Sequence, residues 1–200
     1  MPRVFKKRSK EEGLQSGALV HMGEKEIEKT RITLMDYDET HFQEKEIKTL
    51  DASLPFKDAS TVTWVDVEGT RQVTMLEKLG EHFGLHPLVA EDILNMEERP
   101  KMEDFGGYIL IVLKIPYHCD KRSNGIEIEQ ISLVLGLNFV VSFQEREGDV
   151  FRPIREQIRN NRGRIRELGA DYLAYALVDS IVDTYFTVLE ELEESMESLE

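Results

Sequence analysis

The segment IEIEQISLVLGLNFVVSF, residues 126–143, decides the fold class of this chain. Residues 126–135 and 138–143 flank the pair Gly136-Leu137, and this arrangement predicts two strands joined by a hairpin. Upstream, residues 108–115 are nearly all apolar, as expected for a strand that is covered on both faces. The sequence therefore predicts three successive strands over residues 108–143.

Shorter elements are predicted before these three strands. Alternation of apolar and polar residues predicts strands over residues 31–37, 41–48 and 61–67. The pattern is weakest over residues 41–48. A helix is predicted over about residues 71–83, with Gly84 placed as its C-terminal stop. Pro87 is expected to open a second short helix, because its missing N–H costs nothing in a first helical turn. Helices therefore separate the early strands from the later ones.

The last part of the chain is predicted to be helical. Asp149 is expected to cap a helix that contains Ile154 and Ile158, and residues 170–200 are expected to form one helix of about 45 Å. Apolar residues of that long helix are spaced three and four apart, as in a coiled coil: Leu177, Ile181, Tyr185, Val188, Leu192, Met196 and Leu199. Together these patterns predict an α/β fold with a mixed sheet, followed by a stalk helix.

The composition limits the classes of function. The formal net charge of −14 argues against nonspecific nucleic-acid binding, which needs positive charge to displace counterions from phosphate. Cys119 is the single cysteine, so we expect no disulfide framework and a reducing compartment.

The two ends of the chain carry their own signals. The first residues are basic and lack the apolar core of a signal peptide, so residues 1–16 are expected to form a mobile tail. No run of 18 apolar residues occurs, and the chain as given is not expected to span a membrane. The helical pattern still continues at Glu200, so the natural protein is expected to extend further.

An acidic pair, Glu91 and Asp92, lies in the predicted short helix after Pro87. The simplest interpretation is that both carboxylates favour the positive end of the helix dipole. Asp92 also follows Leu88 by four residues on the same helical face, where a carboxylate that borders an apolar contact needs a partner. Lys101, a divalent cation and another subunit are the candidate partners.

Asp179 and Asp183 form a second acidic feature, four residues apart on the predicted long helix. Two like charges at this spacing cost a few tenths of a kcal/mol, so a solvated helix face is the commoner explanation. A bound divalent ion would instead turn the repulsion into a site with the oxygen ligands that Mg²⁺ prefers.

Other chemistries find less support in the sequence. His82 and His86 are four residues apart, but a glycine and a proline interrupt the helix, and the pair does not form a zinc-binding HExxH motif. Six arginines between Arg152 and Arg166 raise nucleic acid or anionic lipid as partners, although pairing with acids is the better interpretation in so acidic a chain. Because no Gly-rich phosphate loop, GxSxG elbow or triad-like set occurs, no enzyme activity is predicted.

Five motifs carry a resemblance to a known family: TVTWVDVEG (61–69), FGLHPLVAEDILN (83–95), RPKMEDF (99–105), YILIVLK (108–114) and EQISLVLGLNFVVSF (129–143). They resemble the cytoplasmic domain of the CorA family of magnesium and cobalt transporters. The resemblance implies an α/β/α sandwich with a mixed parallel/antiparallel sheet over residues 17–168, and the start of a long stalk helix over residues 169–200. It also implies two membrane helices and a Gly-Met-Asn signature after the stalk, neither of which is in this sequence.

The resemblance further assigns candidate metal ligands. Asp92 matches the aspartate of the family's EDIL motif, which contributes to a divalent-ion site between neighbouring subunits, with a partner acid that would lie beyond residue 200. Glu91 and Asp179 resemble the ligands of a second, adjacent site. The implied ion is Mg²⁺, with Co²⁺ as a further possibility.

The implied function is that of a divalent-cation-sensing domain on the cytoplasmic side of a cell-membrane transporter. The full-length protein is expected to be a homopentamer in which Mg²⁺ between subunits favours the closed channel. Two alternatives stay open, namely the zinc-transporting branch of the same family and a stand-alone soluble metal-binding protein. Neither enzyme activity nor a nucleic-acid partner is expected.

Overall fold

The computed structural model describes residues 30–47, 60–69, 73–119, 125–146, 148 and 150–197, so the predicted tail and Asp149 lie outside the described residues. Seven strands form one sheet in the order β2-β1-β3-β7-β6-β5-β4. Their bounds are β1 Arg31–Tyr37, β2 Phe42–Ile47, β3 Val62–Glu68, β4 Lys101–Asp104, β5 Ile109–Cys119, β6 Gly125–Leu135 and β7 Phe139–Gln144. The pair β3–β7 is parallel and the other neighbouring pairs are antiparallel, which confirms the predicted mixed sheet.

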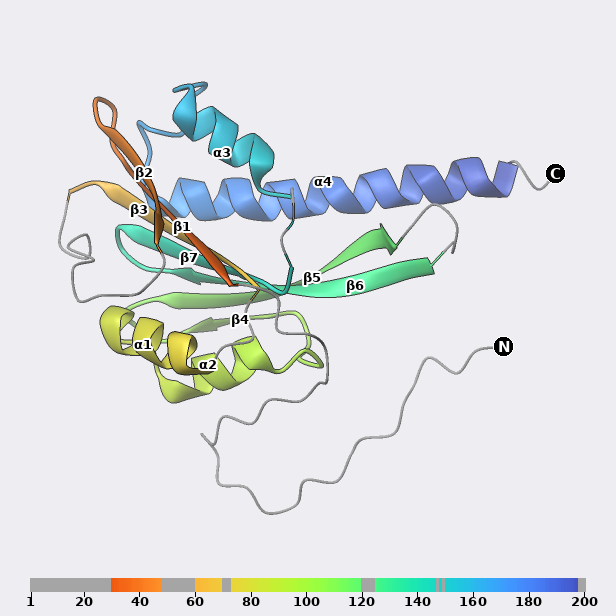
Figure 1. The fold of residues 1–200 in the computed structure, drawn as a ribbon. Helices are drawn as coiled ribbons and strands as arrows, with labels where there is room; N and C mark the ends of the chain where they lie inside the picture. The colour runs from red at the N-terminus through yellow and green to blue at the C-terminus, as the bar shows by residue number, and fades with distance from the viewer. Residues whose placement is uncertain are drawn as a thin grey trace, which may run out of the picture.

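Helices cover both faces of this sheet (Figure 1). Helices α1 (Val73–Phe83) and α2 (Pro87–Leu94) pack on one face, and α3 (Arg152–Arg159) and α4 (Ala170–Glu197) pack on the other. The fold is therefore the expected α/β/α sandwich, with a long helix at the C-terminal end of the described residues.

Two cores result from the alternation of side chains along the strands. Met35 and Trp64 point to the face covered by α3 and α4, whereas Leu34 and Val65, their sequence neighbours, point to the face covered by α1 and α2. All four side chains are fully or almost fully buried. Strands β1 and β3 therefore carry buried apolar side chains on both faces, and the two helical layers pack against them.

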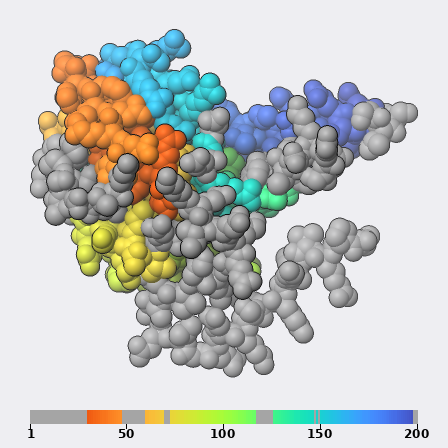
Figure 2. Space-filling model, viewed as in Figure 1, coloured from red at the N-terminus to blue at the C-terminus, as the bar shows by residue number. Residues whose placement is uncertain are grey.

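Helix α4 changes its environment along its length. Its first half buries Leu173, Leu177 and Ile181 against the sheet. Its second half projects away from the body of the molecule (Figures 1 and 2), and Met196 there is 69% exposed. Within the described residues of the predicted apolar stripe, Leu177, Ile181 and Val188 are buried, whereas Tyr185, Leu192 and Met196 are exposed.

By length and composition alone, α4 is the helix in the described part of the chain that could cross a membrane. Length and composition are weak evidence that α4 crosses a membrane, because the first half of the helix packs in the core of the sandwich.

The structure contains one strand that the sequence analysis does not predict: Lys101 begins the edge strand β4, which pairs with β5. The predicted cap, Asp149, lies outside the described residues; within them α3 begins at Arg152, and its N-cap Phe151 makes no side-chain capping bond. Pro153 lies in the first turn and has no N–H to donate to a capping side chain. The other strand bounds agree with the prediction within one residue, except that β5 continues to Cys119.

Candidate metal site

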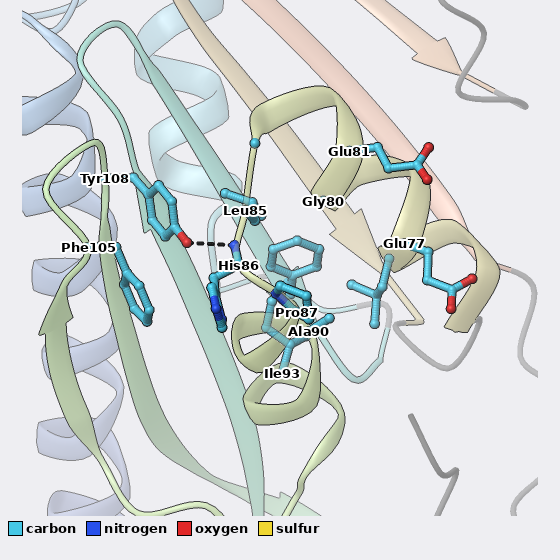
Figure 3. A pocket seen from close by; sticks show the side chains of 13 residues that line it. Glu77, Gly80, Glu81, Leu85, His86, Pro87, Ala90, Ile93, Phe105 and Tyr108 are labelled. Carbon is cyan, nitrogen blue, oxygen red and sulfur yellow. Dashed lines mark hydrogen bonds between the residues drawn. The ribbon is translucent and has the colours of Figure 1, made fainter. Parts of the chain in front are cut away.

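The N-terminal end of α2 is held by His86 and Pro87. His86 is the N-cap, and its Nδ1 accepts a hydrogen bond from the Leu88 N–H at 3.2 Å. Its own backbone N–H donates to the Tyr108 hydroxyl at 2.8 Å (Figure 3). Because Gly84, with φ 69°, separates α1 from α2, His82 and His86 belong to different helices. A capping role therefore accounts for His86, and the zinc interpretation gains no support.

The C-terminal end of α2 is held by side chains from two central strands. The Gln130 amide donates to the carbonyl oxygens of Asp92 at 2.9 Å and Ile93 at 3.3 Å. Lys114 Nζ donates to the Met96 carbonyl at 2.7 Å and to Gln130 Oε1 at 2.8 Å. These bonds satisfy carbonyl groups that a helix end leaves without intrahelical partners. They also fix the last turn of α2, and with it the backbone of Asp92.

The Asp92 carboxylate faces Lys101, one of the three partners that the sequence left open. Lys101 Nζ lies 2.9 Å from Asp92 Oδ2, 3.4 Å from Glu103 Oε1 and 3.6 Å from Glu98 Oε1. The side chains of Asp92 and Lys101 are 17% and 23% exposed, so this cluster is more shielded than an ordinary surface pair. We call Asp92, Glu98, Glu103 and Lys101 the acidic cluster.

Burial and charge act on this cluster in opposite directions. Burial raises the pKa of Asp92 above its ordinary value, although the hydrogen bond and charge of Lys101 oppose the rise. Partial burial of Lys101 disfavours its charge, but the hydrogen bond and charge of Asp92 outweigh this and raise the pKa of Lys101. The cluster therefore contains one ammonium, that of Lys101, and three carboxylates, so its acidic groups outnumber its basic group.

The three predicted ligands do not meet within one chain. Glu91 is half-buried and precedes Asp92 on α2, whereas Asp179 is exposed on α4, on the opposite face of the sheet (Figure 1). Asp183 is exposed on α4 as well. Within the described ranges, no three side chains of His, Cys, Asp or Glu form a group that could hold a metal ion. Any site that combines α2 with α4 therefore requires two chains.

Sequence reasoning missed Glu98, Glu103 and the supporting pair Lys114 and Gln130. The last two face each other in the register of β5 and β6. Lys114 interrupts an apolar run, and a charged residue inside such a run was the signal that could have found it. Gln130 follows the alternating Glu127 and Glu129 and carried no such signal. Glu98 and Glu103 carried no such signal, because each is one acid among many.

A separate cavity of about 970 Å³ lies beside the N-terminal half of α2 (Figure 3). Apolar side chains such as Leu85, Pro87 and Phe105 line it, together with the carboxylates of Glu77 and Glu81. No member of the acidic cluster lines this cavity, so it is not part of the candidate metal site.

Most of the arginine run forms contacts within the chain, as the sequence predicted. Four of its members pair with acids, in the combinations Arg152–Glu156, Arg155–Asp66, Arg159–Glu44 and Arg164–Glu167. Arg166 donates instead to the Ile158 carbonyl at 2.7 Å. These contacts stabilise the packing of α3 and the following turn, and they leave little positive charge for a nucleic acid.

Comparison with known proteins places these features in a family. The family model described as "CorA-like Mg2+ transporter protein" matches residues 59–200. The cobalt/magnesium transport protein CorA of Thermotoga maritima is 46% identical over 195 residues, which cover 98% of this chain and 55% of that protein. The chain thus spans about half the length of this relative.

Solved structures show the same fold. The CorA magnesium transporter of Methanocaldococcus jannaschii matches with a TM-score of 0.62 at 20% identity, over 83% of this chain and 49% of that chain. The ZntB cytoplasmic domain of Vibrio parahaemolyticus matches with a TM-score of 0.63 at 12% identity, over 84% of this chain and 65% of that chain. The match of the family model over residues 59–200 and the identity to the Thermotoga protein establish that this chain belongs to the CorA-like Mg²⁺ transporter family.

Proposed function

We propose that this chain is the cytoplasmic, cation-sensing domain of a magnesium and cobalt transporter in the cell membrane. Family membership and the 46% identity to a cobalt/magnesium transport protein support the ion class. The observation that carries the proposal is the Asp92 carboxylate, shielded at the C-terminal end of α2 within a cluster that holds more carboxylates than cations. We expect the full-length protein to act as a transporter and not as an enzyme, and the name of its relative, a cobalt/magnesium transport protein, supports the transport activity.

The sensing step is electrostatic. Carboxylates of neighbouring subunits repel each other when no cation lies between them, by roughly 4 kcal/mol for two charges about 4 Å apart at an effective dielectric of 20. A Mg²⁺ ion between Asp92 and an acid of the next subunit reverses the sign of this term and favours the closed channel. An affinity near 1 mM corresponds to only about −4 kcal/mol per site, but several sites on one ring shift its equilibrium strongly.

The second site of the proposal joins Glu91 with Asp179 of a neighbouring subunit. Helices α2 and α4 cover opposite faces of the sheet, so these two residues can share an ion only when one chain presents α2 and the next presents α4. This arrangement suits a closed ring of identical subunits, for which we propose a homopentamer.

The zinc-transporting branch is the second candidate. The likeness to the ZntB cytoplasmic domain favours it, but at 12% identity that likeness concerns the fold alone. The identity to a cobalt/magnesium transport protein therefore favours magnesium and cobalt as the transported ions.

Ion flux into liposomes tests the proposal in the full-length protein that contains this chain. Uptake of Mg²⁺ or Co²⁺ is expected, and millimolar Mg²⁺ on the side of this domain is expected to slow it. An Asp92→Asn variant is expected to lose that inhibition while it keeps the flux. Uptake of Zn²⁺ without Mg²⁺ or Co²⁺ would instead select the zinc branch, and inhibition that is unchanged in Asp92→Asn would reject the assigned sensor site.

A further inference from the structure

Lys101 occupies the centre of the acidic cluster. Its ammonium lies within 4 Å of carboxylates from three separate segments: Asp92 on α2, Glu98 in the loop that follows, and Glu103 on β4. The backbone of Lys101 is fixed, because it pairs with Val112 of β5 in the sheet. The protein thus supplies a cation of its own at the point where three carboxylates approach each other.

The side chain of Lys101 can move although its backbone cannot. A lysine ammonium is a compact, strongly hydrated point charge on a flexible four-carbon stem. Glu98 and Glu103 can keep the ammonium near the cluster when it leaves Asp92, because both already lie within 4 Å of it. Asp92 can therefore exchange its partner without leaving Lys101 unpaired.

We propose that Lys101 is a tethered competitor that sets the cation affinity of the Asp92 site: a divalent ion that takes Asp92 Oδ2 as a ligand must displace the Lys101 ammonium from that oxygen. This inference rests on the proposed function of Asp92 as a ligand. It adds a residue that determines how much Mg²⁺ the sensor needs before it responds.

The competition lowers the affinity of the Asp92 site for a divalent ion. Without Lys101, the carboxylates of Asp92, Glu98 and Glu103 lose their shared counter-charge, which favours a divalent ion at Asp92. With Lys101 in place, a divalent ion must replace a charge-assisted hydrogen bond of 2.9 Å before it gains its own contact. Removal of the Lys101 ammonium by mutation is therefore expected to raise the affinity for Mg²⁺ by about tenfold or more.

Titration of Mg²⁺ into the full-length protein, followed by calorimetry, tests the competition. Lys101→Met is expected to bind Mg²⁺ about tenfold more tightly than the wild type. Lys78→Met is the matched control, because Lys78 is exposed on α1, on the same side of the sheet, and its loss changes the net charge equally. The control is expected to stay within about twofold of the wild type, since exposed charges at a distance are screened by salt.

Lys101→Arg provides a second measurement that retains the charge and the fold. A planar guanidinium holds carboxylates through two parallel hydrogen bonds, so this variant is expected to bind Mg²⁺ about threefold more weakly than the wild type. Equal affinities of Lys101→Met and Lys78→Met, or a Lys101→Arg variant that binds as tightly as Lys101→Met, would overturn the competition.

Asp92→Asn distinguishes failure of the proposed ligand role of Asp92 from failure of the competition by Lys101. If Asp92→Asn removes Mg²⁺ binding while Lys101→Met matches its control, the proposed function stands and the competition is wrong. If Asp92→Asn binds Mg²⁺ like the wild type, the proposed function of Asp92 fails, and the competition fails with it. Tighter binding in Lys101→Met that disappears in the Lys101→Met/Asp92→Asn double variant supports both.

Discussion

Replacement of Arg155 by methionine is expected to destabilise the protein by about 3–5 kcal/mol, because it leaves a buried carboxylate without its counter-charge. Asp66 on β3 is only 3% exposed, and Arg155 reaches it from α3 with an Nη1–Oδ2 distance of 2.6 Å. The other carboxylate oxygen, Oδ1, accepts hydrogen bonds from Ser142 at 2.6 Å and from Gln144 at 2.9 Å. These two neutral donors remain in the variant and do not replace the lost positive charge.

The matched control is Arg159→Met. Arg159 makes a similar contact of 2.6 Å to Glu44, but its side chain is 42% exposed, so its loss is expected to cost no more than about 1 kcal/mol. Both variants remove one arginine of α3 and replace it with the same side chain. The difference between them therefore measures the effect of burial on the ion pair.

The assay is urea unfolding at neutral pH, repeated at lower pH. Burial raises the pKa of Asp66 against the effects of Ser142 and Arg155, and loss of Arg155 raises that pKa further. Protonated Asp66 needs no counter-charge, so the deficit of Arg155→Met is expected to shrink as the pH falls toward 4. A deficit below about 1 kcal/mol, equal to that of Arg159→Met and independent of pH, would refute the reasoning.

Two further predictions concern other sites in the sheet. Burial, with the nearby charge of Glu145, raises the pKa of Glu129 to about 7, so the folded protein loses stability as the pH rises from about 4.5 to about 7. Glu129→Gln removes this loss, and its free energy of unfolding in urea is expected to exceed that of the wild type by about 3 kcal/mol at pH 8 and to match it near pH 4. Gly136→Ala places a Cβ 2.1 Å from the buried ring of Phe139 and is expected to cost about 1–3 kcal/mol by the same assay. Gly107→Ala is the control, since its Cβ meets no atom within 4 Å, and equal effects at both positions would contradict the packing argument.

The order of most helices and strands could be predicted, because hydrophobic periodicity distinguishes the two kinds of element along the chain. The apolar and alternating patterns of β1, β3, β6 and β7 are typical of strands. The bounds that these patterns predict agree with the structure within one residue. β4 could not be predicted in this way. Its sequence, KMED, has three exposed residues and no apolar alternation, and it forms a strand because the turn from Phe105 to Tyr108 folds it back onto β5.

The candidate site was predictable only in part. The position of Asp92 beside Leu88 predicted that the carboxylate needs a partner, and Lys101 was among the candidates. The convergence of Glu98 and Glu103 on the same ammonium depends on the pairing of β4 with β5, which the pattern of residues does not reveal. Whether Glu91 and Asp179 share an ion depends on a second chain, because one chain places them on opposite faces of its sheet.

Protection from proteolysis by Mg²⁺ tests the central claim most directly, namely that Asp92 is a ligand of a regulatory ion between subunits. The assembled full-length protein is digested at increasing Mg²⁺ concentrations, as wild type, as Asp92→Asn and as Glu97→Gln, where Glu97 is an exposed carboxylate in the loop after α2. Millimolar Mg²⁺ is expected to protect the wild type and Glu97→Gln equally, and to leave Asp92→Asn as sensitive as without Mg²⁺. Equal protection of Asp92→Asn and the wild type at every Mg²⁺ concentration would contradict the account.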